Sequence, residues 1–276
     1  MMPPGLRRFA RNRMAVVGAA ILITLLLLVV VSPLLFPGSP FRLAGPTLQP
    51  PGGRFLLGTD TLGRDVAAEI AYGARTSLLI GVGATLAAIL FGAFIGGLAG
   101  YYRGPVEMVL MRLTEFFQTI PAFILAILIV AILSPSVPAE MFAIAAVSWP
   151  GIARLVRGEF VALGGREFVQ ACAGLGASDA RIILRHMLPN CASSIIAVGS
   201  LLIGTAILIE AGLAFLGLGD PNVMSWGLII AAGRAVLRSA WWICTFPGIA
   251  ILLTVLGINL VGDGLNEALN PRFRNR

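Results

Sequence analysis

The sequence predicts an all-α membrane protein that crosses the bilayer six times. Hydrophobic residues make up 58% of the 276 positions and charged residues 12%, whereas a soluble domain has roughly 45–50% apolar and about 25% charged residues. Six stretches are apolar enough to cross about 30 Å of hydrocarbon as helices of ~20 residues. Helices are expected because each backbone amide must find its partner within the segment when water is absent.

The six expected spans leave two long segments on one side of the membrane and one on the other. Their approximate limits are 14–35, 77–101, 106–133, 141–161, 192–218 and 244–261.

Arginines precede the first span, as in a secretory signal peptide. Its 22 residues exceed the roughly 7–15 of a signal core, and no clean cleavage site follows. We therefore expect an uncleaved membrane anchor.

The arginines indicate which side of the membrane each segment faces. The chain has no lysine, so all 20 basic side chains are arginines. With the N-terminus in the cytosol, 14 arginines fall on the cytosolic side and six outside, which agrees with the positive-inside rule. We predict one transmembrane domain, 1–276, with both termini cytosolic. Its cytosolic parts would be 1–13, 162–191 and 262–276, and its extracytoplasmic parts 36–76 and 219–243. Membrane-flanking arginines explain the net charge of +7, so no nucleic-acid partner is expected.

The sequence contains no motif for catalysis, metal binding or cofactor binding. The three cysteines, Cys172, Cys191 and Cys244, form no C-x-x-C pair, and His186 is the single histidine. There is no G-x-x-x-x-G-K-[ST] phosphate loop and no H-E-x-x-H zinc motif. We expect this chain not to be an enzyme and not to hydrolyse ATP by itself.

Two carboxylates within the predicted spans are candidates for lining a translocation path. A charged group at the bilayer centre costs about 2.5–3.5 kcal/mol on insertion scales, so such residues are functional candidates. Glu210 lies at mid-depth in the fifth span, where a hydrogen bond to a neighbouring helix would also account for it. Glu115 lies nearer the cytosolic side of the third span, where an ion pair with Arg112 or an interface position would also account for it. Both alternatives stay open for each residue.

Glycines and prolines predict how the helices pack and bend. Gly92, Gly96 and Gly100 recur every four residues, so they share one helix face that a neighbouring backbone can approach closely. Pro121 and Pro150 interrupt the third and fourth spans, and each can bend its helix.

The polar segment between the fourth and fifth spans is the most informative part of the chain. From Glu167 it reads as a short helix that ends in a glycine turn with positive φ. Ser178 is placed to cap a second helix, whose first turn carries Asp179 and whose end is marked by Pro189. Two short helices around a glycine turn would form a compact cytosolic knob.

Three interpretations of this segment compete. A DNA-binding helix-turn-helix is disfavoured because the segment has no third helix and is tethered between spans, whereas a plain cytosolic connector stays open. In the third, the segment resembles the EAA loop of permease subunits in binding-protein-dependent ABC importers, which reads E-A-A, three residues, G, nine residues, I-x-L-P. Here Gln170-Ala171-Cys172 takes the E-A-A place, Gly176 the glycine and His186-Met187-Leu188-Pro189 the end. Gln170 departs from the pattern and removes the acid that could pair with an ATPase.

Further blocks along the chain resemble the second, C-type permease of dipeptide, oligopeptide and nickel importers. In order they are LGTDTLGRDV at 57–66, YGARTSLLIG at 72–81, AGYYRG at 99–104, WPGIARLVRGE at 149–159, FLGLG at 215–219, SWG at 225–227 and NLVGDGLNEALNPR at 259–272. Together these blocks cover nearly the whole chain.

The resemblance implies a type I ABC importer permease fold in the bacterial cytoplasmic (inner) membrane. The implied partners are membrane lipid, a homologous permease, two cytosolic ATP-binding subunits that use ATP and Mg, and an extracytoplasmic substrate-binding protein. The helix that begins near Ser178 would be the coupling helix. The resemblance assigns ATPase coupling to Glu167, Gln170, Ala171, Gly174, Gly176, Ala177, Ser178, Asp179, Arg181, Ile182, Arg185, His186, Leu188 and Pro189.

The implied cargo is a di- or oligopeptide. Closely similar permeases handle nickel chelates, glutathione or opines, and these alternatives stay open. A secondary transporter driven by an ion gradient is a remote alternative. It predicts inverted repeats and a broken-helix ion site, and the chain has no convincing internal repeat.

Overall fold

The computed structural model describes residues 9–269, where regular structure is helical apart from isolated bridges. The helices are α2 (Arg13–Leu35), α3 (Val66–Tyr102), α4 (Gly104–Thr119), α5 (Ala122–Leu133), α6 (Val137–Gly164), α7 (Glu167–Gly174), α8 (Asp179–Arg181), α9 (Leu188–Phe215), α10 (Trp226–Gly233) and α11 (Trp242–Leu269). A π-helix, Ile182–Met187, joins α8 to α9, and a 3₁₀ turn, Arg234–Val236, follows α10.

The helices account for five membrane crossings, or six if one bent pair forms a single span. Five helices are long and apolar enough to span a bilayer: α2, α3, α6, the continuous helix Asp179–Phe215, and Trp242–Ala268 within α11. The candidate for the sixth crossing is the pair α4 and α5, which bends by 86° at the break that contains Pro121. The predicted all-α polytopic architecture is confirmed, with the third span bent into two helices.

The second span starts earlier than its hydropathy indicates. α3 begins at Val66, 11 residues before the predicted start at position 77. The Asp65 side chain caps this helix by accepting a hydrogen bond from the Ala67 amide at 2.9 Å. Glu69 and Arg75 lower the hydropathy of these first turns, which nevertheless bury Ile70 and pack against the rest of the bundle.

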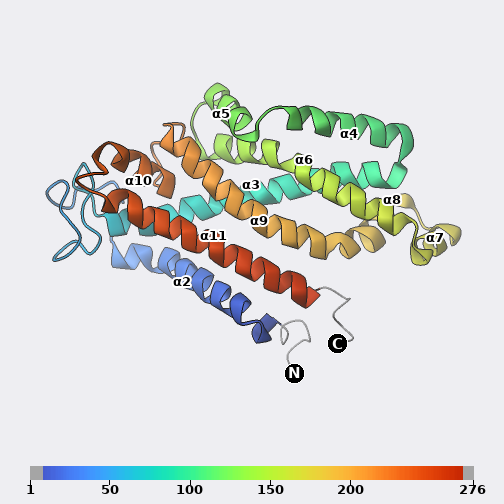
Figure 1. The fold of residues 1–276 in the computed structure, drawn as a ribbon, viewed down its shortest axis with the longest axis horizontal. Coiled ribbons are helices and arrows are strands. Elements are labelled where there is room, and N and C mark those ends of the chain that lie inside the picture. The colour runs from blue at the N-terminus through green and yellow to red at the C-terminus, as the bar shows by residue number, and fades with distance from the viewer. Residues whose placement is uncertain (1–8, 270–276) are drawn as a thin grey trace.

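The helices form three layers in Figure 1. α2 and α11 lie side by side at one edge, α9, α3 and α6 form the middle, and α4 with α5 covers the opposite edge. The loop 36–65 and α10 lie at one end of the bundle, and α7 lies at the other. We name these the outer end and the inner end, after the predicted orientation.

The predicted glycine seam is the contact between α3 and α6. A Cβ on Gly92 would lie 2.6 Å from the Trp149 carbonyl oxygen, and one on Gly100 would lie 2.6 Å from the Phe160 Cβ. A Cβ on Gly96 would collide with the Ala153 backbone. Small residues therefore let these two backbones touch, as the four-residue spacing predicted.

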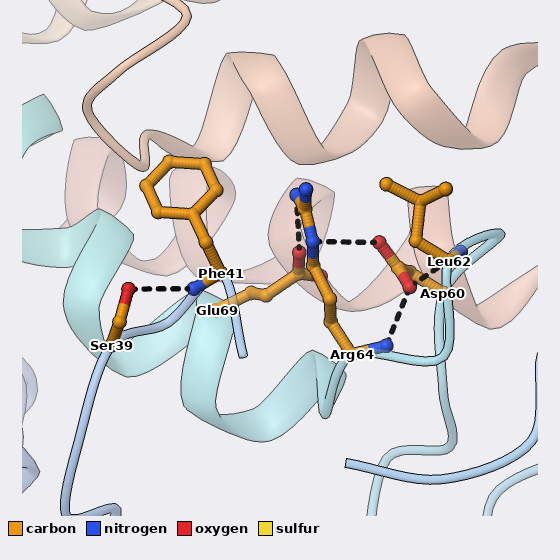
Figure 2. Close-up of polar contacts among 6 residues, drawn as sticks. All are labelled: Ser39, Phe41, Asp60, Leu62, Arg64 and Glu69. Carbon is orange, nitrogen blue, oxygen red and sulfur yellow. Dashed lines mark hydrogen bonds and ion pairs between the residues drawn. The ribbon is translucent and has the colours of Figure 1, made fainter. Parts of the chain in front are cut away.

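A buried ion cluster fixes the outer loop to the start of α3 (Figure 2). Arg64 lies between two carboxylates: its Nε is 4.0 Å from Asp60 Oδ2 and its Nη1 is 3.8 Å from Glu69 Oε1. Asp60 also accepts hydrogen bonds from the Leu62 and Arg64 amides at 2.8 and 2.7 Å. The Arg64 guanidinium lies over the Phe41 ring at 4.9 Å. The block LGTDTLGRDV thus folds into an internally paired cap on the bundle.

The segment 219–243, predicted as an extracytoplasmic loop, contains a helix inserted into the bundle. α10 packs against α9, α11 and α3. Trp226 is buried and donates its indole N–H to the Ile70 carbonyl at 3.0 Å, and Trp242 donates to the Thr59 carbonyl at 3.1 Å. Both indoles at the outer end therefore find their partners within this chain.

Candidate functional site

The segment 167–190, which we name the coupling segment, projects from the inner end of the bundle (Figure 1). It comprises α7, a glycine turn, α8, the π-helix and the first residues of α9. Most of its polar side chains are exposed. The exposed members of the predicted coupling set are Glu167, Gln170, Ala171, Gly174, Gly176, Ser178, Asp179, Arg181, Arg185 and Pro189, and the half-buried members are Ala177, His186 and Leu188.

The turn after α7 has the predicted geometry. Gly176 has φ of +78°. The Ala177 amide donates to the Cys172 carbonyl at 3.1 Å, and the Gly176 amide donates to the Ala173 carbonyl at 3.0 Å. These are the two hydrogen bonds of a Schellman motif, which needs a left-handed residue at its centre. The predicted positive φ at this glycine is confirmed.

The start of the second helix is held differently from the prediction. Ser178 occupies the N-cap position with extended backbone angles, but its hydroxyl makes no capping hydrogen bond within residues 9–269. Instead, Tyr101 at the end of α3 donates its hydroxyl to Asp179 Oδ1 at 2.7 Å. This bond ties the coupling segment to a membrane-spanning helix 78 residues away in sequence.

The prediction that Pro189 ends the second helix is wrong. The helix runs without a break from Asp179 through Phe215. A proline lacks an amide donor and crowds the carbonyl four residues earlier, which normally stops a helix. Here Pro189 lies in the first turn of α9, and the preceding π-helix has wider turns that accommodate it. The coupling segment is therefore continuous with a membrane span.

The apolar surface of the coupling segment also differs from the prediction. Ile182 was expected at this surface, but it is buried against Met187 and Val169 inside the protein. The most exposed large apolar side chains are Leu175 at 88% and Leu184 at 64%, followed by Phe168 at 41%. The motif alone did not identify Leu175, although its place between two helix-ending glycines puts it at the tip of the knob.

Glu210 takes part in a hydrogen-bond chain within the bundle. It is 1% exposed, and its Oε2 accepts a hydrogen bond from Ser77 Oγ at 3.1 Å. Ser77 Oγ in turn accepts from the Trp226 amide at 3.2 Å, so the chain joins α9, α3 and the start of α10. Glu140, which sequence reasoning missed, is also buried and accepts from the Asp220 amide at 3.1 Å. These contacts favour a packing role for both carboxylates.

Glu115 lies in a different environment, on an open face of α4. It pairs with Arg112 at 3.1 Å, and the two side chains are 58% and 81% exposed. They line a pocket of about 460 Å³ between α4 and α6, together with Arg154 and the ion pair of Arg157 with Glu107. In the part of the chain that the structure describes, no group of three or more His, Cys, Asp or Glu could hold a metal ion.

Comparison with known families decides what kind of protein contains these features. Residues 88–275 match the family described as the inner membrane component of binding-protein-dependent transport systems. Residues 5–51 match the N-terminal transmembrane domain of oligopeptide transport permease C. The chain belongs to this family of inner membrane transport components. Membership implies a second permease and ATPase subunits as partners of this permease, and a multi-pass location in the inner membrane.

Individual relatives extend the match over nearly the whole permease. It is 40% identical to the dipeptide transport system permease protein DppC of Alkalihalophilus pseudofirmus, over 98% of this chain and 89% of that protein. It is 38% identical to the glutathione transport system permease protein GsiD of Pectobacterium atrosepticum, over 82% and 75% of the two chains. A solved inward-facing structure of the MetNI methionine ABC transporter matches with a TM-score of 0.62 at 17% identity, covering 73% of this chain and 96% of that chain. The permease thus shares the fold of that transporter.

Proposed function

We infer that this permease, paired with a homologous permease, forms the path by which di- and oligopeptides enter the cytosol. An extracytoplasmic binding protein delivers the peptide, and two cytosolic ATPases drive its passage. The relatives named for dipeptide transport support the peptide class. Glutathione, the cargo named for another relative, is itself a peptide and is the second candidate.

The observation that carries this proposal is the geometry of the coupling segment. Leu175 and Leu184 are exposed on this segment, which also carries the exposed arginines Arg181 and Arg185. Apolar anchors with a charged rim are typical of a surface that docks another protein. We assign this surface to a cleft of the ATPase.

The continuous helix through Phe215 gives the docked ATPase a way to move the pathway. A force on α8 acts directly on α9, because no break separates the two. The hydrogen bond from Tyr101 to Asp179 transmits the same movement to α3. The knob and two spans then rotate as one body when the ATPases close, which is a rigid-body form of switching.

Gln170 sets how the segment contacts its ATPase. Its side chain is exposed and carries no charge, where the family pattern has a glutamate. We propose that docking here relies on the apolar tip and on Arg181 and Arg185. ATP and Mg are used by the partner ATPases, and this chain binds neither. Both of its termini are cytosolic in this proposal.

Uptake by proteoliposomes tests the function. The vesicles contain this permease with its partner permease, the ATPases and the binding protein, and a labelled dipeptide is offered outside. Uptake that requires ATP and the loaded binding protein is expected. ATP hydrolysis stimulated by the loaded binding protein without peptide uptake would contradict the substrate and retain the machine. A gradient-driven uptake independent of ATP would contradict the whole proposal.

A further inference from the structure

The pocket between α4 and α6 has a charge pattern that membership of the family does not explain. Three faces can be distinguished on α4. Leu110, Thr114 and Phe117 pack against the bundle. A second face is apolar and exposed, and a third carries Met108, Arg112 and Glu115. The apolar face suits lipid and the charged face does not.

The charged face lies some distance along α4 and α6 from their inner ends. Arg103 at the turn between α3 and α4 donates to the Val161 carbonyl at 3.0 Å, so the inner ends of α4 and α6 lie side by side. At 1.5 Å per residue, Glu115 is about 16 Å along α4 from Gly104, and Arg154 is about 15 Å along α6 from Gly164. Arg154 lies within α6, a helix long and apolar enough to span a bilayer, and an exposed charge within such a span faces water or protein rather than lipid.

One positive charge in the pocket has no partner. Arg112 pairs with Glu115, and Arg157 pairs with Glu107. Arg154 is exposed into the same pocket, and its guanidinium makes no ion pair or hydrogen bond to any of residues 9–269. The paired charges cancel one another, so the pocket presents a single uncompensated guanidinium.

The surface beside Arg154 is open enough for an extended chain. Gly151 and Gly158 flank it on the same face of α6, three residues before and four residues after. A Cβ at either glycine would meet no atom within 4 Å. The face therefore offers free backbone surface on both sides of the guanidinium.

We propose that Arg154 binds the α-carboxylate of the peptide cargo in the inner half of the pathway, with Gly151 and Gly158 leaving room for the peptide backbone. This proposal rests on the proposed peptide import. A guanidinium binds a carboxylate through two parallel N–H···O hydrogen bonds. Peptides of any sequence share a carboxyl terminus, so such a subsite recognises cargo without reading its side chains.

The test compares a tripeptide with its C-terminal amide in proteoliposomes that contain the complete importer. Peptide occupancy is first measured on the binding protein alone, and both forms are then offered on saturating binding protein. The wild-type permease is expected to import the free acid faster than the amide. Arg154→Gln should lower the maximal rate for the acid about tenfold and leave the amide unchanged. Arg154→Lys should restore only part of the acid rate, because an ammonium still attracts the carboxylate but cannot form the two parallel hydrogen bonds.

The matched control is Arg238→Gln, which removes an exposed arginine at the outer end and should change neither rate. ATP hydrolysis stimulated by the loaded binding protein should persist in all variants. An unchanged acid-to-amide ratio in Arg154→Gln would overturn the subsite. Equal loss of acid and amide uptake, with reduced copurification of the partner permease, would show that Arg154 pairs with a carboxylate of that subunit instead. If the wild type imports neither peptide while its ATPase is stimulated, the proposed peptide function fails, and the subsite fails with it.

Discussion

The two ends of this permease handle polar and apolar groups in opposite ways. At the outer end, Arg64 lies between two buried carboxylates, and the indoles of Trp226 and Trp242 donate to backbone carbonyls. At the inner end, Leu175 and Leu184 are left exposed at the tip of a knob. The outer end pairs these buried charges and indoles within this chain, whereas the inner end exposes a segment that we assign to docking of the ATPase. Stability should therefore depend on the outer end and coupling on the inner end.

The largest effect is expected at the outer ion cluster. Arg64→Leu leaves Asp60 and Glu69 buried without their counter-charge, and breaking such a cluster costs about 3–5 kcal/mol. Thermal unfolding of the purified permease in detergent should shift strongly to lower temperature. Arg42→Leu removes an exposed arginine from the same loop and serves as the control. Equal shifts in the two variants would refute the internal pairing of the outer end.

Two glycines with nearly the same backbone angle sharpen the comparison. Gly63 has φ of +82° and Gly176 has φ of +78°. A Cβ at Gly63 would collide with the Gly45 carbonyl, whereas one at Gly176 would meet nothing within 4 Å. Gly176→Ala should cost only the left-handed strain of about 1–2 kcal/mol, and Gly63→Ala should cost more.

The same thermal unfolding assay measures both glycine variants, with Gly174→Ala as the control for a helical, open position in the coupling segment. Equal destabilisation by Gly63→Ala and Gly176→Ala would show that the outer loop is no more tightly packed than the knob. A larger effect of Gly176→Ala on ATPase copurification than on unfolding would support its place in the docking surface.

The exposed leucines of the knob should affect coupling more than stability. Leu175→Ala and Leu184→Ala remove surface side chains, so the free energy of unfolding should change by less than about 0.5 kcal/mol. Loss of a docking anchor costs about 1–2 kcal/mol of binding or more, so ATPase affinity should fall roughly tenfold. Leu43→Ala, in the outer loop and 67% exposed, is the control. Unaltered ATPase affinity in both knob variants would remove these leucines from the interface.

The smallest effect is expected at Glu210. In Glu210→Gln the side-chain oxygen can still accept the hydrogen bond from Ser77, and a neutral hydrogen bond of this kind is worth about 0.5–1.5 kcal/mol. Peptide uptake should stay within about twofold of the wild type, with a small change in unfolding temperature. Strongly slowed uptake with unchanged stability would place this carboxylate on the pathway and contradict its packing role.

Local features were predicted well from the sequence. The positive φ at Gly176 and the seam of Gly92, Gly96 and Gly100 follow from what a residue without a side chain permits, which needs no knowledge of distant contacts. Pro121 bends the third span where expected, because the missing amide donor acts on its own helix. The five long apolar helices follow from hydropathy in the same way.

Features that depend on distant contacts were not predicted. The hydrogen bond of Tyr101 with Asp179 joins residues that are 78 positions apart in sequence. No sequence pattern in either segment predicts this contact. Ile182 and Leu184 are equally apolar, so only the packing of the knob on α6 and α9 decides which one is buried. Pro189 was misjudged because a π-helical turn before it accommodates what an α-helix would not. The insertion of α10 depends on pockets formed by three other helices.

Hydrogen–deuterium exchange of the permease pair, measured with and without the ATPase subunits, tests the central claim most directly. If the ATPases dock on the inner end and the outer loop folds independently of them, ATPase binding should slow exchange across 167–184 and leave 36–65 unchanged. Unchanged exchange across 167–184 in the assembled complex would contradict this account, because the ATPases would then be docked elsewhere.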